Sequence, residues 1–292
     1  TRFTGSLTSI DADQAEDIGD SSHINDQDSN GNSNNISTMT LTTDEAISAT
    51  VAANLAGKGT AVYSAGLTGS LDTYDNGVAL TSAFSTASTE DDDVAVAIVE
   101  DNPLSGGDVD ELNRIAAATD GDITATISGE AEDLANLSGI SNKDLTITVT
   151  NAIGITALGT LQGTSSNDVQ ITGSITDSLS ALYDADNAGA ADNQGLRAAA
   201  LNTAIAADND VIVIVDEDSA ITSGDFAKLN AIAGHSEHDS TGNAGYIQAD
   251  VSGTASAINT NLGNLTDKDH ITFTVSGTST WDALQDVDEK TE

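Results

Sequence analysis

Short runs in which hydrophobic and polar residues alternate recur along the chain and predict β-strands. Each run is rich in Val, Ile, Leu and Thr, the residue types that favour an extended backbone. The starts of successive runs lie 21 to 42 residues apart, which leaves room for a helix between strands and favours parallel pairing. The predicted strands are Met39–Thr43, Thr60–Gly66, Val94–Val99, Ile123–Ile127, Leu145–Val149, Val169–Ile175, Val211–Val215, Ile247–Val251 and Ile271–Val275.

Two stretches between these runs have the 3.6-residue spacing of amphipathic helices. Gly107 and Asp108 indicate the start of the first helix, and Asp225 takes the capping position of the second. Both stretches place an apolar stripe on one face, and we therefore expect each helix to pack on the strands. The stripes are Val109, Leu112, Ile115 and Ala116 in the first helix, and Phe226, Leu229, Ile232 and Ala233 in the second.

The pattern repeats within the chain. Val94–Ala116 aligns without a gap on Val211–Ala233, at an offset of 117 residues (211 − 94). Internal repetition on this scale is typical of solenoids and arrays, in which similar units stack on one another. Three further pairs match with small changes in length: Met39–Tyr63 with Thr146–Ile171, Ile123–Ala131 with Ile247–Ala255, and Leu145–Thr150 with Ile271–Ser276.

These features predict a β-rich α/β solenoid, in which parallel strands stack from coils of a strand plus a short helix or turn, tandemly duplicated. A pair of α+β domains joined near Asp144 is the alternative. We divide the chain into an N-terminal strand with an acidic polar loop (1–37), a first repeat block (38–143), a second block (144–264), and the start of a third block or a C-terminal cap (265–292). Phe3–Ile10 is a candidate first strand, and Asp11–Asn35 is predicted to be irregular.

The charge balance restricts the partners that the chain can have. Only 8 Lys and Arg residues oppose 47 Asp and Glu residues, giving a formal net charge of −39. Binding to nucleic acid or to an anionic membrane requires clustered cations, so neither is expected. No run of 18 apolar residues occurs, and we expect no membrane insertion. A chain with this net charge repels itself unless ions screen it. We therefore expect the protein to function in surroundings rich in salt or divalent ions.

Calcium is the cofactor that the acidic segments suggest. Asp26, Asp28 and Asn30 follow the D-x-D-x-N-G spacing of the first half of a calcium loop, although Ser37 takes the place of the acid at the twelfth position. A solvated polar loop is the alternative interpretation.

Acidic turns also flank the same predicted strand in both copies of the repeat. Glu90–Asp93 and Glu100–Asp101 flank it in the first copy, and Asp208–Asp210 and Asp216–Asp218 flank it in the second. Shared divalent cations would relieve repulsion between these carboxylates. Charged turns that keep strand ends soluble are the alternative. The candidate calcium ligands in these turns are Asp101, Asp216 and Asp218.

Signals for catalysis are weak, and we expect no enzymatic activity. The chain has no cysteine, no G-x-S-x-G nucleophile motif and no Lys after Gly106-Gly107 to form a phosphate loop. His235 and His238 form an H-x-x-H pair without a third spaced ligand, which is more typical of a loop than of a zinc site. Glycoside hydrolysis needs a pair of acids, usually beside aromatic platforms, and Trp281 is the only tryptophan.

The Ala/Thr/Gly/Asp-rich stretches DITATISGEAEDLANLSG (122–139) and LTITVTNAIGITALGTL (145–161) resemble repeats of bacterial surface-layer and adhesin-like proteins. They are similar also to fibrous structural proteins of marine cyanophages. The resemblance implies an extracellular or cell-surface structural protein that forms a homo-oligomer or polymer, often with calcium, and a cell-surface polysaccharide is a further partner to consider. A virion fibre or appendage is one alternative, and a carbohydrate-binding or carbohydrate-active solenoid is another.

Overall fold

The computed structural model describes residues 5–20, 39–137, 140, 144–165, 167–183, 198–207, 211–233 and 245–290. In these residues the chain is an α/β protein with parallel strands. It divides into two compact units. The first unit comprises residues 1–128, 136–146 and 164–167, and the second comprises residues 129–135, 147–163 and 168–292.

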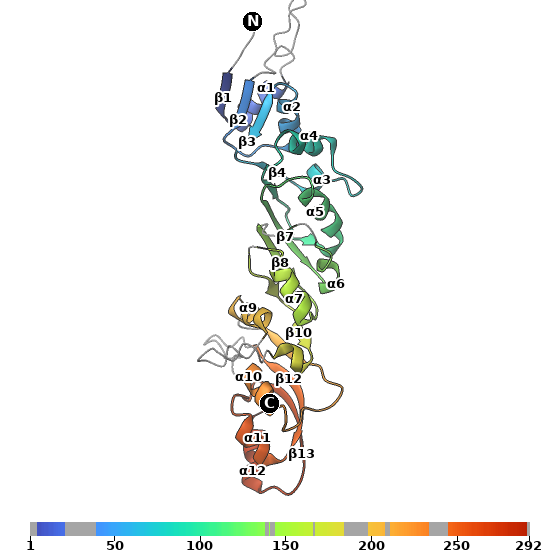
Figure 1. Cartoon of the computed structure of the whole chain (residues 1–292), viewed down its shortest axis with the longest axis vertical. Helices are drawn as coiled ribbons and strands as arrows, with labels where there is room; N and C mark the ends of the chain where they lie inside the picture. Colours follow the sequence, from blue (N-terminus) through green and yellow to red (C-terminus); the bar gives the residue numbers. More distant parts are fainter. Residues whose placement is uncertain are drawn as a thin grey trace, which may run out of the picture. The chain divides into compact units, whose positions relative to one another are not determined.

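The first unit begins with three parallel strands in the order of the chain (Figure 1). They are β1 (Gly5–Ile10), β2 (Met39–Thr43) and β3 (Thr60–Tyr63). Three helices pack beside them: α1 (Ala12–Asp20), α2 (Ala49–Ala56) and α4 (Ser82–Glu90).

A further set of parallel strands follows in the same unit, in which β4, β5 and β7 are neighbours and β6 also pairs with β7. The bounds of these strands are Leu67–Gly69 (β4), Val96–Ile98 (β5), Leu104–Ser105 (β6) and Ile123–Gly129 (β7). The connections hold α3 (Leu71–Tyr74), the 3₁₀ turn η1 (Gly106–Asp108) and α5 (Val109–Ala116).

The second unit repeats this alternation of strand and helix. β8 (Asp144–Val149), of which residues 147–149 belong to this unit, pairs with β9 (Gln170–Ile171), and a four-stranded parallel sheet follows in the order β10, β11, β12, β13. The strands of that sheet are Ser174–Asp177, Ile212–Val215, Ile247–Gly253 and His270–Val275. The helices are α6 (Ala131–Leu134), α7 (Ile155–Gln162), α8 (Leu179–Leu182), α9 (Ala199–Ala207), α10 (Phe226–Ala233), α11 (Ala255–Asn261) and α12 (Trp281–Asp288).

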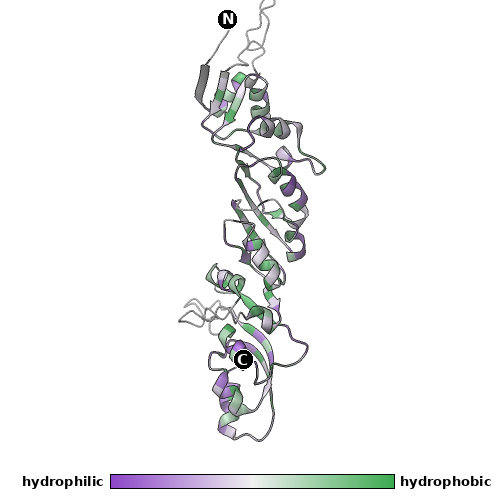
Figure 2. Cartoon of the chain, in the orientation of Figure 1, coloured by the Kyte–Doolittle hydropathy of each residue, from purple (hydrophilic) through white to green (hydrophobic). Residues whose placement is uncertain are grey.

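The alternation in the sequence corresponds to the burial of side chains. In β7, Ile123, Ala125 and Ile127 are buried and the residues between them are exposed. β12 shows the same pattern over Ile247–Val251. Figure 2 shows hydrophobic and hydrophilic residues next to one another on single strands and helices. Because side chains alternate between the two faces of a strand, this pattern covers one face with helices and leaves the other in contact with water.

The helix predicted after Gly107 is present, but its start differs from the prediction. A 3₁₀ turn precedes α5, and the backbone N–H and Oγ of Ser105 donate to Asp108 Oδ2 at 2.7 and 2.9 Å. Asp108 thus bonds back to Ser105 in a capping box and does not cap α5 with its side chain. The second helix, α10, begins directly after Asp225 as expected.

Three other predictions need correction. The segment Asp11–Asn35 was expected to be irregular, yet α1 occupies residues 12–20; Asp11 Oδ1 accepts the N–H of Gln14 at 2.8 Å, and Ala15 is fully buried. The predicted strand Thr60–Gly66 is shorter, because the chain turns at Gly66, whose φ of +77° suits glycine. Likewise Val169–Ile175 is divided between β9 and β10.

Candidate functional site

The acidic turns that follow β5 and β11 are engaged with the backbone of neighbouring helices. Glu100 Oε1 accepts the N–H of Leu71, the first residue of α3, at 2.7 Å. Glu217 Oε1 accepts the N–H of Leu179, the first residue of α8, also at 2.7 Å. The first N–H groups of a helix have no acceptor within the helix, so each carboxylate satisfies one of them. Each turn is thereby joined to a helix that precedes it in the chain.

The same arrangement occurs at three other strand ends. In each case a polar side chain at or just after the end of a strand accepts the N–H of the first residue of an earlier helix. We call this contact an inter-segment cap, a segment being one strand with the helix that follows it. The three further caps join Glu45 to Ala12 (3.3 Å), Asn151 to Ala131 (2.8 Å) and Asp177 to Ile155 (3.0 Å).

A hollow lies beside the acidic turn in both copies of the repeat. The first, of about 310 Å³, is lined by residues of the turn after β5 together with Thr126 of β7. The second, of about 170 Å³, is lined by residues of the turn after β11 together with Asp250 of β12. Thr126 and Asp250 are at matching positions in the two copies, so the hollow recurs while one lining residue changes from neutral to acidic.

The described candidate calcium ligands lie on the surface. Asp101, Asp216 and Asp218 are exposed; Asp101 lines the first hollow and Asp216 the second. Within the part of the chain that the structure describes, no three or more His, Cys, Asp or Glu side chains are arranged to hold a metal ion. The remaining candidates, Asp26, Asp28, Asn30 and the His235–Asp239 cluster, lie outside the described residues.

The turn Glu90–Asp93 also bonds to backbone. Glu90 Oε1 accepts the N–H of Ala61 at 3.1 Å, and Asp91 Oδ2 accepts the N–H of Tyr63 at 2.6 Å. Burial raises the pKa of Asp91, and the neighbouring Asp93 and Asp92 raise it further. Burial also raises the pKa of Tyr63, whose hydroxyl donates to the carbonyl oxygen of Ala52 at 2.7 Å. These two carboxylates therefore hold β3 in place.

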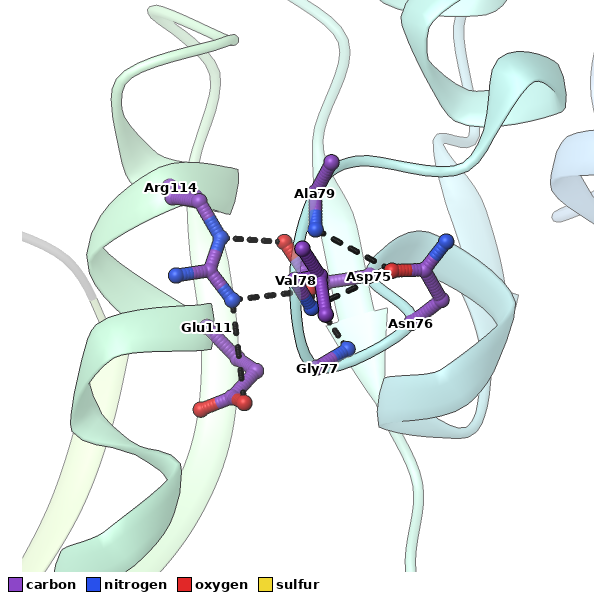
Figure 3. A network of polar contacts seen from close by, with 7 residues as sticks. All are labelled: Asp75, Asn76, Gly77, Val78, Ala79, Glu111 and Arg114. Atoms are coloured by element: carbon purple, nitrogen blue, oxygen red, sulfur yellow. Dashed lines mark hydrogen bonds and ion pairs between the residues drawn. The ribbon is translucent and has the colours of Figure 1, made fainter.

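An ion pair between a half-buried arginine and a buried carboxylate joins α5 to the turn after α3 (Figure 3). Arg114 Nε and Nη2 donate to Asp75 Oδ2 and Oδ1 at 2.7 and 2.8 Å, and the N–H of Gly77 donates to Oδ1 at 2.9 Å. The Asp75 side chain is fully buried, and Glu111 Oε1 lies 3.6 Å from the guanidinium. The paired geometry of two parallel N–H···O bonds is the strongest that Arg makes with a carboxylate.

The second copy of the repeat lacks this guanidinium. Ala231 stands 117 residues after Arg114, and it is buried. Sequence reasoning missed the pair, although Arg114 is one of only 8 Lys and Arg residues in the chain. A rare cation in an acidic helix was the signal that could have pointed to it.

We expect Asp75 to make stability depend on pH. The hydrogen bond from Arg114, with that from Gly77, lowers the pKa of Asp75 although burial opposes this. A lowered pKa in the folded state means that the ionised carboxylate stabilises the fold above the unfolded pKa, about 4, and that this stabilisation is lost as the pH falls through the lower folded pKa. Asp75→Asn should therefore lower the melting temperature by several degrees at neutral pH and by much less in acid.

The measurement is the difference in melting temperature between Asp75→Asn and the native chain, followed by circular dichroism from neutral to acid pH. Taking the difference removes the general effect of neutralising a chain of charge −39. A difference that stays constant across this range would contradict the assignment.

The comparisons with known proteins give no match: no family model fits the chain, and no curated protein and no solved structure is significantly similar to it. Across the described ranges, none of the helices combines the length and the apolar character needed to cross a membrane. The site is thus defined by its geometry. Polar side chains, most of them carboxylates, join one segment to another, and further carboxylates face water beside two matching hollows.

Proposed function

We propose that the protein is a non-enzymatic, extracellular structural protein that assembles with copies of itself into a surface layer, filament or appendage. The observation that carries this proposal is the set of inter-segment caps. Polar side chains that could have lined a reactive site instead join segments to one another at five places, which is the construction that an extended scaffold needs.

The architecture that we propose for this scaffold is a tandemly duplicated solenoid. In support, the order of elements recurs: α2, β3, β4, α3, α4 and β5 correspond to α7, β9, β10, α8, α9 and β11. Isolated pairings correspond as well, since Ile47 pairs with Leu67 in the first copy and Ile153 with Ile175 in the second, both in parallel. Stacked repeats expose sheet edges at their ends, and exposed edges favour pairing with another chain.

Calcium is the cofactor we propose for the assembly, and a cell-surface polysaccharide is a further partner. Copies that each carry a formal charge of −39 repel one another until ions screen or bridge them. The exposed carboxylates of Asp101, Asp216 and Asp218 offer oxygen ligands that Ca²⁺ prefers.

The test is electron microscopy of the purified chain with millimolar calcium, with a chelator, and with sodium chloride at matched ionic strength. Ordered sheets or filaments that form in calcium and disappear in chelator are the expected result. Assembly in sodium chloride alone would assign the effect to screening and not to bound calcium. A dispersed monomer under all three conditions would contradict the proposal. A closed trimer would instead support the virion-fibre alternative.

A further inference from the structure

The turn that connects α3 to α4 is exposed to water and contains an asparagine followed by a glycine. Asn76, Gly77 and Val78 are all exposed, Val78 to 85 %. The N–H of Asn76 donates to the carbonyl oxygen of Ala79 at 3.0 Å, which closes the turn. Gly77 has a φ of +86°, a backbone conformation that favours glycine, so the turn itself requires this residue after the asparagine.

An asparagine that precedes a glycine can modify itself with water as the only other reactant. Once the backbone nitrogen of Gly77 has lost its proton to base, its electron pair can attack Cγ of Asn76. A bond forms between this nitrogen and Cγ, the bond from Cγ to Nδ2 breaks, and Nδ2 leaves as ammonia after taking up a proton. Water then opens the resulting succinimide ring to aspartate or isoaspartate. Glycine favours ring closure because it has no Cβ that shields the nitrogen.

In the folded chain both reacting groups are held by hydrogen bonds (Figure 3). The N–H of Gly77 donates to Asp75 Oδ1 at 2.9 Å. Asn76 Oδ1 accepts the N–H groups of Val78 and Ala79, both at 3.1 Å. Loss of the Gly77 proton requires its bond to Asp75 to break, and the three bonds together keep the turn in one conformation. We therefore expect the ring to close from the opened turn and not from the closed one.

The Asp75 carboxylate anchors this turn to α5. The oxygen that accepts the N–H of Gly77 also accepts Arg114 Nη2 at 2.8 Å, and the other oxygen accepts Arg114 Nε at 2.7 Å. Because the Asp75 side chain is fully buried, removal of the guanidinium would leave a buried charge without its partner. The carboxylate would then move toward water, and the bond that it accepts from Gly77 would break with it.

We propose that Asn76 is a site of spontaneous succinimide formation, and that the Arg114 guanidinium sets the rate of this modification by holding the turn closed. The inference does not depend on the proposed function. Conversion to aspartate adds a negative charge beside Asp75 and Glu111, which already share one guanidinium. Conversion to isoaspartate adds a methylene group to the backbone, so the original turn cannot form again. The modification thus marks each molecule whose turn has opened.

Mass spectrometry of the full chain tests this inference. The chain is incubated in mildly alkaline buffer and then digested after glutamate, so that Asn76 falls in the peptide 46–90 in every variant. Arg114→Gln removes the charge and the paired bonds. We expect it to accelerate the conversion of Asn76 about tenfold, because the rate follows the population of the opened turn. The native chain in urea should react faster still, since the turn is then lost.

Leu112→Ala is the matched control, because Leu112 is fully buried on the same helix as Arg114. This variant loses core packing and keeps every hydrogen bond to Asp75, so the rate at Asn76 should not change. Equal acceleration in both variants would show that the reaction proceeds through unfolding of the whole unit, and would overturn the inference. Circular dichroism establishes that each variant is folded, and Arg114→Lys or Leu112→Val replaces one that is not.

Asn30, which also precedes a glycine, supplies an internal reference. It lies outside the described residues and falls in the peptide 17–45 of the same digest. Conversion at Asn76 is expressed relative to conversion at Asn30, which removes differences in buffer and temperature between samples. A ratio that is the same in the native chain and in Arg114→Gln, or the same with and without urea, would overturn the inference.

Discussion

Gly121→Ala should lower the free energy of unfolding by about 3 kcal/mol, a large loss for a residue that carries no side chain. A Cβ on Gly121 would lie 2.3 Å from the carbonyl oxygens of Asp93 and Val94, so backbone on one side or the other must move. The Thr119 hydroxyl restrains the same place, since it donates to the carbonyl oxygen of Val94 at 2.6 Å and accepts the N–H of Gly121 at 3.0 Å. Urea unfolding followed by circular dichroism measures the loss.

Gly224→Ala is the matched control for this substitution. No atom lies within 4 Å of the position that a Cβ would take on Gly224, and the residue is exposed. We expect the control to change the free energy of unfolding by no more than about 0.5 kcal/mol. Equal losses for the two variants would show that the close approach at Gly121 has no energetic weight.

Phe226→Ala should cost about 3–5 kcal/mol, the range measured when a large aromatic side chain is removed from a packed core. Phe226 is fully buried at the start of α10, and its Cζ lies 2.9 Å from the position that a Cβ would take on Gly253 of β12. The ring therefore fills the space between helix and strand that the glycine leaves. Its removal leaves a cavity that neither backbone can readily close.

The first copy of the repeat supplies a natural comparison, because Val109 occupies the position of Phe226 there. Phe226→Val should consequently cost less than Phe226→Ala in the same urea experiment. Val78→Ala, at an exposed residue, provides the baseline. If Phe226→Ala costs no more than this baseline, the ring does not contribute to the core as described.

The strands that alternate strictly could be predicted from the sequence. Ile123–Ile127 and Ile271–Val275 both lie within observed strands, because their apolar residues recur at the period of a pleated backbone. The helix at residues 12–20 could not be predicted in this way. Its apolar stripe is short, consisting of Ala12, Ala15 and Ile18 in an otherwise acidic and polar segment, and the helix is held by the cap at Asp11 and by packing of Ala15.

Part of the candidate site could also be predicted. The repetition of the acidic turns was visible in the sequence, but the role of Glu100 and Glu217 was not, because their partners lie 29 and 38 residues earlier in the chain. The pair of Asp75 and Arg114 spans 39 residues. Contacts of this kind depend on which segments become neighbours in the fold, and local pattern carries no information on that.

The inter-segment caps have a consequence for how such a chain can change in length. Each cap joins a strand end to one earlier helix through a single hydrogen bond. A recombination event that inserts or removes one whole segment can therefore restore the same bond at the new junction, whereas a partial insertion breaks it. Changes in the length of such a chain are therefore expected in steps of complete segments, and the internal sequence match at an offset of 117 residues spans several of them.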